Sequence, residues 1–430
     1  MYRPDLEAGT VDAIRDRQLT RLNALLREVL PANRFYQAKL GDCLAPLSWE
    51  EFRRLPFTTK QELVADQAMH PPLGNIATYE PKRYKTYHQT SGTTGRPLIV
   101  LDTRESWDWW SECWNYVYHA AGVTPSDRIF FAFSFGPYIG FWSAFEGARR
   151  LGALTIPGGG LDSLSRLELM RRNRPTVLLS TPTYAIRLVE IAEEQGQSLQ
   201  ELGVRVTIHA GEPGASIPAV RSRVEHAFGS LSFDHAGGTE VGAYGYSCEA
   251  RDGVHVNEEE FIAEVIDPLT GEQVIEGNLG ELLITNLGRA GWPVIRYRTG
   301  DIVMFGGSGC ACGRTFLKLP GGLLGRVDDL MIVRGVNIYP SSVEAIVRTF
   351  KVGEFRLVRT LQLGMEELTV EIEAHQDVAH LLADRLRQRL GVRIPTRVVS
   401  AGSLPRFELK AKRVIDRRKQ PANVEVETKV

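Results

Sequence analysis

Hydrophobic and polar positions change period along the middle of the chain, and this change predicts strands and helices in turn. Short, nearly continuous apolar runs predict buried strands over 128–133, 153–157, 176–180 and 204–210. Apolar residues at helical spacing between these runs predict helices over 141–151, 161–174 and 182–194. Buried strands separated by helices are typical of a mostly parallel sheet covered on both faces, so the predicted fold class is α/β. Ligands of such sheets bind at the carboxyl ends of the strands.

The regions on either side of this pattern are predicted to differ from it. Residues 1–80 read mainly as helices, with an apolar stripe that stops before Pro31 and consists of Leu19, Leu22, Leu25, Leu26 and Val29. The PFTTK stretch at 56–60 predicts a turn and a short helix capped by Thr58 or Thr59. A helix over 106–121 carries many aromatic residues, which at this spacing indicate core packing. Near the C-terminus, a small α+β domain is predicted from helices over 341–350 and 381–390 and strands over 368–372 and 397–399.

Composition and charge exclude several classes of protein. A chain of 430 residues predicts two or three domains, and 43% hydrophobic with 24% charged residues is typical of a globular protein. The net charge of −1 offers no basic field to nucleic acid or to an anionic membrane. The first residues have no apolar signal segment, and no apolar run is long enough to cross a membrane. Five cysteines without a signal segment do not indicate a disulfide framework, so we expect a cytoplasmic protein.

A stretch rich in glycine and hydroxyl side chains, TSGTTGRP at 90–97, is the strongest candidate for a binding loop. Glycines let a turn present several backbone N–H groups to an anion, and hydroxyls add donors for phosphate oxygens. The residues concerned are Thr90, Ser91, Gly92, Thr93, Thr94 and Gly95. The stretch is not a Walker A loop, because no Gly-Lys-Ser/Thr closes it. A plain solvated loop is the alternative, since Ser, Thr and Gly often cluster there.

Three thiols and one imidazole form a second candidate site. Cys248 is followed by His255, and Cys310 by Cys312. This ligand set suits a closed, tetrahedral structural Zn²⁺ site. Strands predicted over 261–267 and 280–286 would bring the two halves together as antiparallel neighbours. Reduced free thiols are the alternative.

The order of these and further stretches resembles that of the adenylate-forming superfamily, which includes acyl-CoA ligases, luciferases and peptide-synthetase adenylation domains. The stretches are TSGTTGRP at 90–97, AGEPG at 210–214, HAGGTE at 235–240, YRTGD at 297–301 and GRVDD at 325–329. The PFTTK, GEP, CACGRT and LPR stretches are similar to those of phenylacetate–CoA ligases. The resemblance covers nearly the whole chain. It implies an adenylation domain over 1–327 and a small mobile C-terminal domain over 328–430.

The resemblance also implies how the nucleotide is bound. The residues concerned are those of the loop at 90–95 together with Gly211, Glu212, Pro213, Asp234, Ala236, Gly237, Thr239, Asp301 and Arg326. By this match Thr239 contacts the α-phosphate, and Glu240 holds a Mg²⁺ ion that bridges phosphate oxygens. Asp301 accepts from the ribose hydroxyls, and Arg326 donates to ribose or phosphate. Ala236 stands where the family usually has a tyrosine that stacks on adenine.

Other roles follow from the same resemblance. Lys410 aligns with a lysine that approaches the acyl carboxylate and the α-phosphate, and Lys412 is the alternative. Asp328 matches the hinge position, and Gly335 lies on the loop that faces the nucleotide site during thioester formation. The aromatic, glycine-containing stretch at 133–142 is expected to wall the acyl pocket, through Phe135, Gly136, Tyr138 and Phe141. A packed strand-to-helix turn is the alternative for this stretch.

The implied activity is that of an AMP-forming acid–CoA ligase. A carboxylate attacks the α-phosphorus of ATP to give acyl-AMP, and CoA then displaces AMP, so ATP, Mg²⁺ and CoA are the expected cofactors. The aromatic stretch suits an aryl or arylacetic acid. The alternatives are a short or hydroxylated aliphatic acid, acyl transfer to a carrier-protein thiol, and a non-catalytic nucleotide sensor. A homodimer is also left open.

Overall fold

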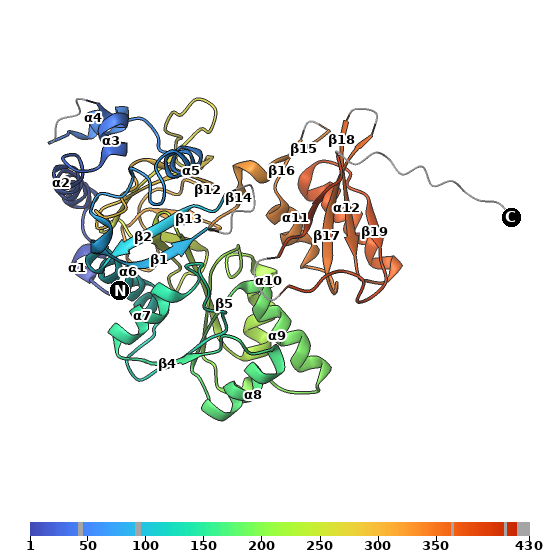
Figure 1. The fold of residues 1–430 in the computed structure, drawn as a ribbon. Helices are drawn as coiled ribbons and strands as arrows, with labels where there is room; N and C mark the ends of the chain where they lie inside the picture. The colour runs from blue at the N-terminus through green and yellow to red at the C-terminus, as the bar shows by residue number, and fades with distance from the viewer. Residues whose placement is uncertain (42–45, 91–95, 335, 363–364, 408–410, 419–430) are drawn as a thin grey trace. The chain divides into compact units, whose positions relative to one another are not determined.

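The computed structural model describes residues 1–41, 46–90, 96–334, 336–362, 365–407 and 411–418. The chain divides into two compact units, Met1–Val327 and Asp328–Val430 (Figure 1). The first unit carries the predicted parallel sheet and most of the candidate site residues.

The main sheet of the first unit has two halves that differ in strand direction. Within the described residues its strand order is β13-β9-β8-β7-β6-β5-β3-β4. The parallel half consists of β3 (Arg128–Phe131), β4 (Leu154–Pro157), β5 (Val177–Ser180), β6 (Val206–His209) and β7 (Leu231–Gly238). The antiparallel half adds β8 (Gly242–Tyr246), β9 (Gly253–Val256) and β13 (Lys318–Pro320). The predicted α/β class is confirmed, and the parallel part is limited to the half from β4 to β7.

Helices α7 (Trp142–Leu151), α8 (Ser163–Asn173), α9 (Pro182–Glu194) and α10 (Pro218–Phe228) connect the parallel strands, and α6 (Arg104–Ala120) precedes the first of these strands. All of them except α10 were predicted. Helices α8, α9 and α10 lie side by side, and α6 packs on α7 (Figure 1). The sequence interpretation omitted α10, although Val220, Val224 and Phe228 recur at helical spacing and are buried.

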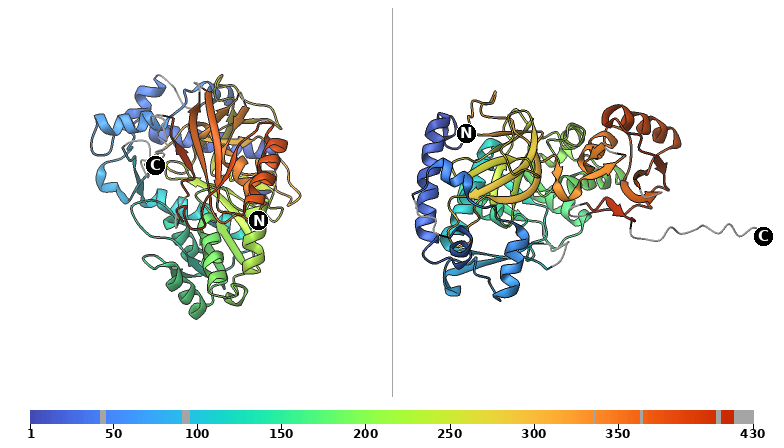
Figure 2. Two further views of the ribbon diagram at one scale, coloured as in Figure 1. Left: turned by 90° about the vertical axis from the view of Figure 1, so that its right-hand side faces the viewer. Right: turned by 90° about the horizontal axis from the view of Figure 1, so that it is seen from above.

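The N-terminal residues are helical, as predicted. The helices are α1 (Pro4–Glu7), α2 (Val11–Val29), α3 (Arg34–Leu40), α4 (Trp49–Arg54) and α5 (Lys60–Met69). Helix α2 lies beside strand β10 (Phe261–Ile266), and the Gln18 amide donates to the Phe261 carbonyl over 2.8 Å (Figure 2). The cap of α5 is Thr59, whose side chain and that of Glu62 each accept a backbone N–H of the other residue.

Two further sheets complete the first unit. One is antiparallel and joins β10 to β11 (Leu279–Asn286), β12 (Tyr297–Met304) and β14 (Gly325–Arg326). The other is the hairpin of β1 (Tyr84–Gln89) and β2 (Ile99–Thr103), which flanks the predicted phosphate loop. Helix α6 packs against this hairpin and against β8.

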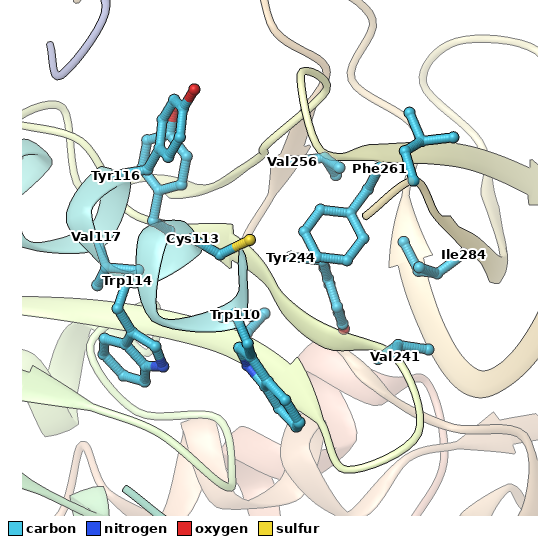
Figure 3. Packing of buried hydrophobic residues seen from close by; sticks show 14 of the residues in the cluster. Trp110, Cys113, Trp114, Tyr116, Val117, Val241, Tyr244, Val256, Phe261 and Ile284 are labelled. Carbon is cyan, nitrogen blue, oxygen red and sulfur yellow. The ribbon is translucent and has the colours of Figure 1, made fainter. Parts of the chain in front are cut away.

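The aromatic face of α6 is part of the core, as its spacing predicted. Trp110, Cys113, Trp114 and Tyr116 are all at most 2% exposed and belong to one buried cluster with Tyr244 of β8, Val256 of β9 and Phe261 of β10 (Figure 3). Burying this much aromatic surface fixes α6 between the sheets. The loops above the strand ends are therefore held by a rigid base.

The second unit is a small sheet with helices. Its elements are β15 (Met331–Val333), β16 (Val336–Ile338), α11 (Pro340–Val347), β17 (Phe355–Gln362), β18 (Met365–Ile372), α12 (Gln376–Leu390), β19 (Thr396–Val398) and β20 (Val414–Asp416). Strands β17 and β18 are antiparallel neighbours at the centre, and β20 and β19 join their outer edges in parallel. Leu357, Val370 and Leu386 belong to its own buried core.

Among the residues that the structure describes, no helix combines the length and the apolarity needed to span a lipid bilayer.

Candidate active site

The PFTTK stretch lies against the strand that carries YRTGD, far along the sequence. The Thr58 N–H donates to the Arg296 carbonyl over 3.0 Å, and the Arg298 N–H donates back to the Thr58 carbonyl over 2.9 Å. The Thr58 hydroxyl also donates to the Ile295 carbonyl over 2.7 Å, and Thr58 is fully buried. Since α5 begins two residues later, this pairing positions the first residue of that helix, Lys60.

Lys60 meets a predicted site residue. Its Nζ lies 3.1 Å from Oε1 of Glu240, whose side chain is only 12% exposed. Glu240 and Thr239 stand in the turn between β7 and β8, where the parallel half of the sheet gives way to the antiparallel half. The carboxylate predicted to hold Mg²⁺ is therefore paired with an ammonium group.

Tyr297 lies near the carboxylates of both Glu240 and Asp301. Burial raises the pKa of Tyr297 well above its usual range, and the carboxylates of Glu240 and Asp301 raise it further while Arg326 lowers it. Nη1 of Arg326 donates to Oδ1 of Asp301 over 2.9 Å, because these residues are cross-strand partners on β14 and β12. The structure thus brings together three residues that the sequence assigned to one nucleotide: Glu240, Asp301 and Arg326.

The Gly237 backbone leaves no room for a side chain. A Cβ there would lie 2.8 Å from the Gly242 carbonyl oxygen and 2.9 Å from Nε2 of His235. The neighbouring Ala236 is 3% exposed and is the cross-strand partner of Gly245. The Ala236 side chain is therefore packed against β8, whereas the family tyrosine at this position was expected to stack on adenine.

The AGEPG turn follows β6, and two carboxylates hold it. Asp234 accepts the N–H groups of Ala215 and Ser216 over 2.7 and 2.6 Å, and burial raises the pKa of its carboxyl. Glu212 accepts the N–H of Thr183, in the first turn of α9, over 3.0 Å. Gly211 and Pro213 belong to the same turn. The Asp234 side chain is thus used to shape the turn that was expected to border the adenine.

Only the start of the predicted phosphate loop lies within the described residues. Thr90 is buried, its N–H donates to the Leu98 carbonyl over 3.0 Å, and its hydroxyl accepts the Leu98 N–H over 3.1 Å. Ser91, Gly92, Thr93, Thr94 and Gly95 lie outside the described residues. The Gln89 N–H donates to the Pro137 carbonyl over 2.8 Å, so the loop starts beside the aromatic stretch at 133–142.

The residues of this stretch divide between core and surface. Phe141 is 2% exposed and packs against Phe133 and Trp114, with ring centroids 5.3 and 6.3 Å apart. Tyr138, by contrast, is 44% exposed, and a Cβ at Gly136 would have no neighbour within 4 Å. Phe135 is partly buried and lies 4.7 Å from the Trp142 ring. Phe141 therefore takes part in core packing, Phe135 lies partly buried among other aromatic rings, and Gly136 and Tyr138 border more open space.

The four predicted zinc ligands are gathered in one place. Their ligand atoms all lie within 4.8 Å of one another, with 3.8 Å between the sulfurs of Cys248 and Cys310 and 3.5 Å between the Cys312 sulfur and Nε2 of His255. Tetrahedral Zn²⁺ with bonds of about 2.3 Å to sulfur and 2.0 Å to nitrogen needs separations of roughly 3.8 and 3.5 Å. Nδ1 of His255 lies 3.1 Å from the Phe316 carbonyl, which leaves Nε2 for a metal. The donor set fits a structural zinc ion.

The route by which the two halves of this cluster meet differs from the prediction. Strands β10 and β11 are antiparallel neighbours, but they pair with each other in another sheet. The halves are joined by β9 and β13, where His255 is the cross-strand partner of Lys318. Strand β13 has only three residues, which is too short for periodicity to reveal it.

The remaining predicted residues belong to the second unit. Gly335 and Lys410 lie outside the described residues. Asp328 is the first residue of the unit and lies in a short 3-10 helix, Val327–Asp329. Lys412 is exposed.

Lys60 and Tyr297 were not predicted as site residues. Lys60 belongs to the PFTTK stretch and Tyr297 to the YRTGD stretch, both of which the sequence analysis had already picked out. The polar side chains of these two residues were the only local indication that they could belong to the site. Their proximity to Glu240 depends on a pairing between segments that are remote in sequence.

Known proteins match this chain over most of its length. The family model for AMP-binding enzymes matches residues 55–289, and the model for their C-terminal domain matches residues 335–418. A phenylacetate–coenzyme A ligase of Thermus thermophilus is 32% identical, over 97% of this chain and 100% of that protein, and one of Escherichia coli is 31% identical, over 96% and 97%.

A crystal structure of a 2-hydroxyisobutyryl-CoA ligase with an acyl-AMP in the postadenylation state superimposes with a TM-score of 0.91. It is 30% identical and covers 96% of this chain and 91% of that one. Both the sequence motifs and the fold thus lead to the same group of proteins. The chain belongs to the AMP-binding, adenylate-forming enzymes and, among them, to the phenylacetate–CoA ligase family.

Proposed function

We propose that the protein is an ATP-dependent, AMP-forming acid–CoA ligase. In the first step a carboxylate attacks the α-phosphorus of ATP, giving acyl-AMP and pyrophosphate. In the second step the CoA thiol attacks the acyl carbon, and AMP leaves with the electron pair of the C–O bond. The observation that carries the proposal is that Lys60 pairs with Glu240 and Arg326 pairs with Asp301, while Tyr297 lies near the charges of Glu240, Asp301 and Arg326.

The first step joins two anions, so neutralising and aligning charge is the main task of the site. The loop at 90–95 and Thr239 would contact phosphate oxygens, and Glu240 would hold the Mg²⁺ ion that neutralises them. Asp301 and Arg326 would hold the ribose. Lys60, which pairs with Glu240, would donate to a phosphate oxygen when Mg²⁺ is bound to Glu240.

The second unit would serve both steps in turn. Lys410 would approach the acyl carboxylate and α-phosphate during adenylation, and the loop at Gly335 would face the site during thioester formation. The division of the chain at Asp328 supports a hinge at that residue.

The substrate proposed is an aryl or arylacetic acid. Four curated relatives, each covering at least 96% of this chain, are phenylacetate–coenzyme A ligases, and aromatic residues surround Phe135. A short hydroxylated acid is the second candidate, because a 2-hydroxyisobutyryl-CoA ligase of the same fold was solved in complex with 2-HIB-AMP. Acyl transfer to a carrier-protein thiol instead of CoA is the alternative for the second step.

A structural zinc ion at Cys248, His255, Cys310 and Cys312 is proposed as a further part of the enzyme. It would tie the loop after β8 to the segment before β13, and it would take no part in the reaction, since four protein ligands leave no open position.

The test is pyrophosphate release by the purified protein with Mg²⁺ and ATP, over a panel of phenylacetate, benzoate, 2-hydroxyisobutyrate and acetate, with and without CoA. An arylacetic acid is expected to give the highest kcat/KM, with CoA-dependent AMP formation. Pyrophosphate release without consumption of CoA would favour a carrier protein, and no acyl-AMP from any acid would refute the proposal. Sedimentation of the same sample distinguishes a monomer from a homodimer and a cell fractionation tests the cytoplasmic location.

A further inference from the structure

One buried arginine contacts both sides of the candidate nucleotide site. Arg289 follows β11, and its side chain is fully buried, as is that of Asp102 on β2. Placing two charges in the interior is costly, and such a pair often adds no net stability compared with apolar residues of similar size. The pair therefore needs a reason other than stability.

All three nitrogen atoms of the Arg289 guanidinium donate hydrogen bonds. Nε and Nη2 each donate to one Asp102 carboxylate oxygen over 2.7 Å, which is a bidentate pair. Nη1 donates to the carbonyl oxygens of Thr239 and Glu240 over 2.9 and 3.1 Å. The guanidinium plane also lies 4.4 Å from the ring centre of Trp110 on α6.

These contacts connect two elements that are predicted to hold the same phosphates. Asp102 stands on the hairpin strand β2, whose partner β1 runs directly into Thr90 and the loop at 90–95. The two carbonyls belong to the turn that presents the Thr239 and Glu240 side chains. Because two consecutive carbonyls point at one Nη1 atom, the orientation of both peptide groups is determined, and with it the direction of the Glu240 side chain.

The backbone around Arg289 is held as closely as its side chain. A Cβ at Gly288 would lie 2.2 Å from the Trp109 ring, so the segment packs directly on α6. The guanidinium is therefore held by α6 on one side, and by Asp102 and the Thr239–Glu240 turn through hydrogen bonds. A lysine could not reproduce this geometry, because its ammonium is a single point donor without a planar fork.

We propose that Arg289 and Asp102 are positioning residues for adenylation, which hold the β1–β2 hairpin that leads into Thr90 at a fixed position relative to the Mg²⁺ ligand Glu240. This inference rests on the proposed function and extends it to residues that do not touch the substrate. Misplacing reacting groups by about 1 Å can cost on the order of 100-fold in rate.

The experiment compares three variants with the wild type. Arg289→Lys keeps the charge and loses the fork, and the double variant Asp102→Val/Arg289→Met replaces the buried pair with apolar side chains. Glu7→Gln is the matched control, because Glu7 forms an equally buried pair with Arg314, 2.5 Å between Oε2 and Nε, whose residues are assigned no role at the nucleotide. The readouts are melting temperature, acid-dependent ATP–pyrophosphate exchange over a range of Mg²⁺ concentrations, and calorimetric binding of Mg²⁺-ATP without acid.

The double variant is expected to melt close to the wild type and to exchange pyrophosphate about 10- to 100-fold more slowly. Arg289→Lys should lose a similar factor, with a higher Mg²⁺ concentration at half-saturation. Glu7→Gln should melt lower with an unchanged Mg²⁺ dependence. The proposal is overturned if a stable double variant keeps wild-type exchange, or if Glu7→Gln shifts the Mg²⁺ dependence as much as Arg289→Lys.

Calorimetric binding of Mg²⁺-ATP distinguishes failure of the positioning role of Arg289 from failure of the proposed ligase function. If the wild type binds Mg²⁺-ATP but exchanges no pyrophosphate, the ligase function fails. Weaker binding by both Arg289 variants then still supports the positioning role, and equal binding overturns it. If the wild type binds no Mg²⁺-ATP, both proposals fail together.

Discussion

Replacing Lys60 by methionine is expected to separate a small effect on stability from a large effect on catalysis. The Lys60 side chain is 39% exposed and lies 3.1 Å from Glu240, so the ion pair is partly solvated. Pairs of this kind contribute about 0.2–1 kcal/mol. The melting temperature of Lys60→Met should therefore fall by less than about 4 °C.

The loss in activity should be much larger, if Lys60 donates to a phosphate oxygen in the transition state. Hydrogen bonds between charged groups contribute about 1.5–3 kcal/mol, which corresponds to about 10- to 150-fold in kcat/KM for ATP. Mg²⁺ binding without nucleotide should change in the opposite direction. It should become tighter, because the ammonium that neutralises Glu240 has been removed.

The assay is ATP–pyrophosphate exchange with the best acid of the panel, together with Mg²⁺ binding to the nucleotide-free protein. Lys39→Met is the control, since Nζ of Lys39 lies 2.5 Å from Oε1 of Glu62 and this variant removes the same charge from an ion pair of the same unit. The reasoning is refuted if the two variants have kcat/KM values within twofold of each other. It is also refuted if Lys60→Met binds free Mg²⁺ no more tightly than the wild type.

Four other results are expected. Cys312→Ser should purify with less than the roughly one zinc per chain of the wild type, by elemental analysis, and should melt lower because metal binding contributes to folding; equal zinc content would contradict the site. Gly237→Ala should lower stability by about 1–3 kcal/mol in urea unfolding, since its Cβ would lie 2.8 Å from the Gly242 carbonyl oxygen, and an unchanged midpoint would show that the turn gives way easily. Burial raises the pKa of Glu258 to about 7, so its folded form favours the proton and the wild type loses stability as pH rises through 7; Glu258→Gln should therefore gain about 1–3 kcal/mol relative to the wild type between pH 5 and 8.5, and a constant difference would count against the shift. Lys410→Ala should slow adenylation on the order of 100-fold or more and leave thioester formation from supplied acyl-AMP much less affected, whereas equal losses in the two half-reactions would exclude the assigned role.

Local features of this fold were readable from the sequence because short-range forces determine them. The cap of α5 at Thr59, the helix that begins at Pro182 and the aromatic core face of α6 all depend on neighbours within a few residues. The parallel strands β3, β4, β5 and β6 were found for the same reason, since each is a compact apolar run, whereas β7 (Leu231–Gly238) was not predicted. Helix α10 was missed although its apolar spacing is regular, so that error lay in the interpretation of the sequence.

Contacts between distant segments could not be inferred in this way. Thr58 was considered only as a helix cap, whereas in the structure it pairs with Tyr297 and so brings Lys60 to Glu240. The pairing of β9 with β13, which closes the cysteine cluster, has the same character. In both cases the partners depend on the path of the backbone, which has no local signature.

The pairing at Thr58 has a consequence for the order in which the protein can fold as it is made. Thr58 and Ile295 are 237 positions apart, and ribosomes add about 5–20 residues per second. An early segment of the nascent chain must therefore wait roughly 12 to 47 s before its partner strand is synthesised. During that interval Lys60 and Glu240 have no fixed relation, so a chain interrupted before residue 295 should bind no nucleotide, however well its parallel strands have formed.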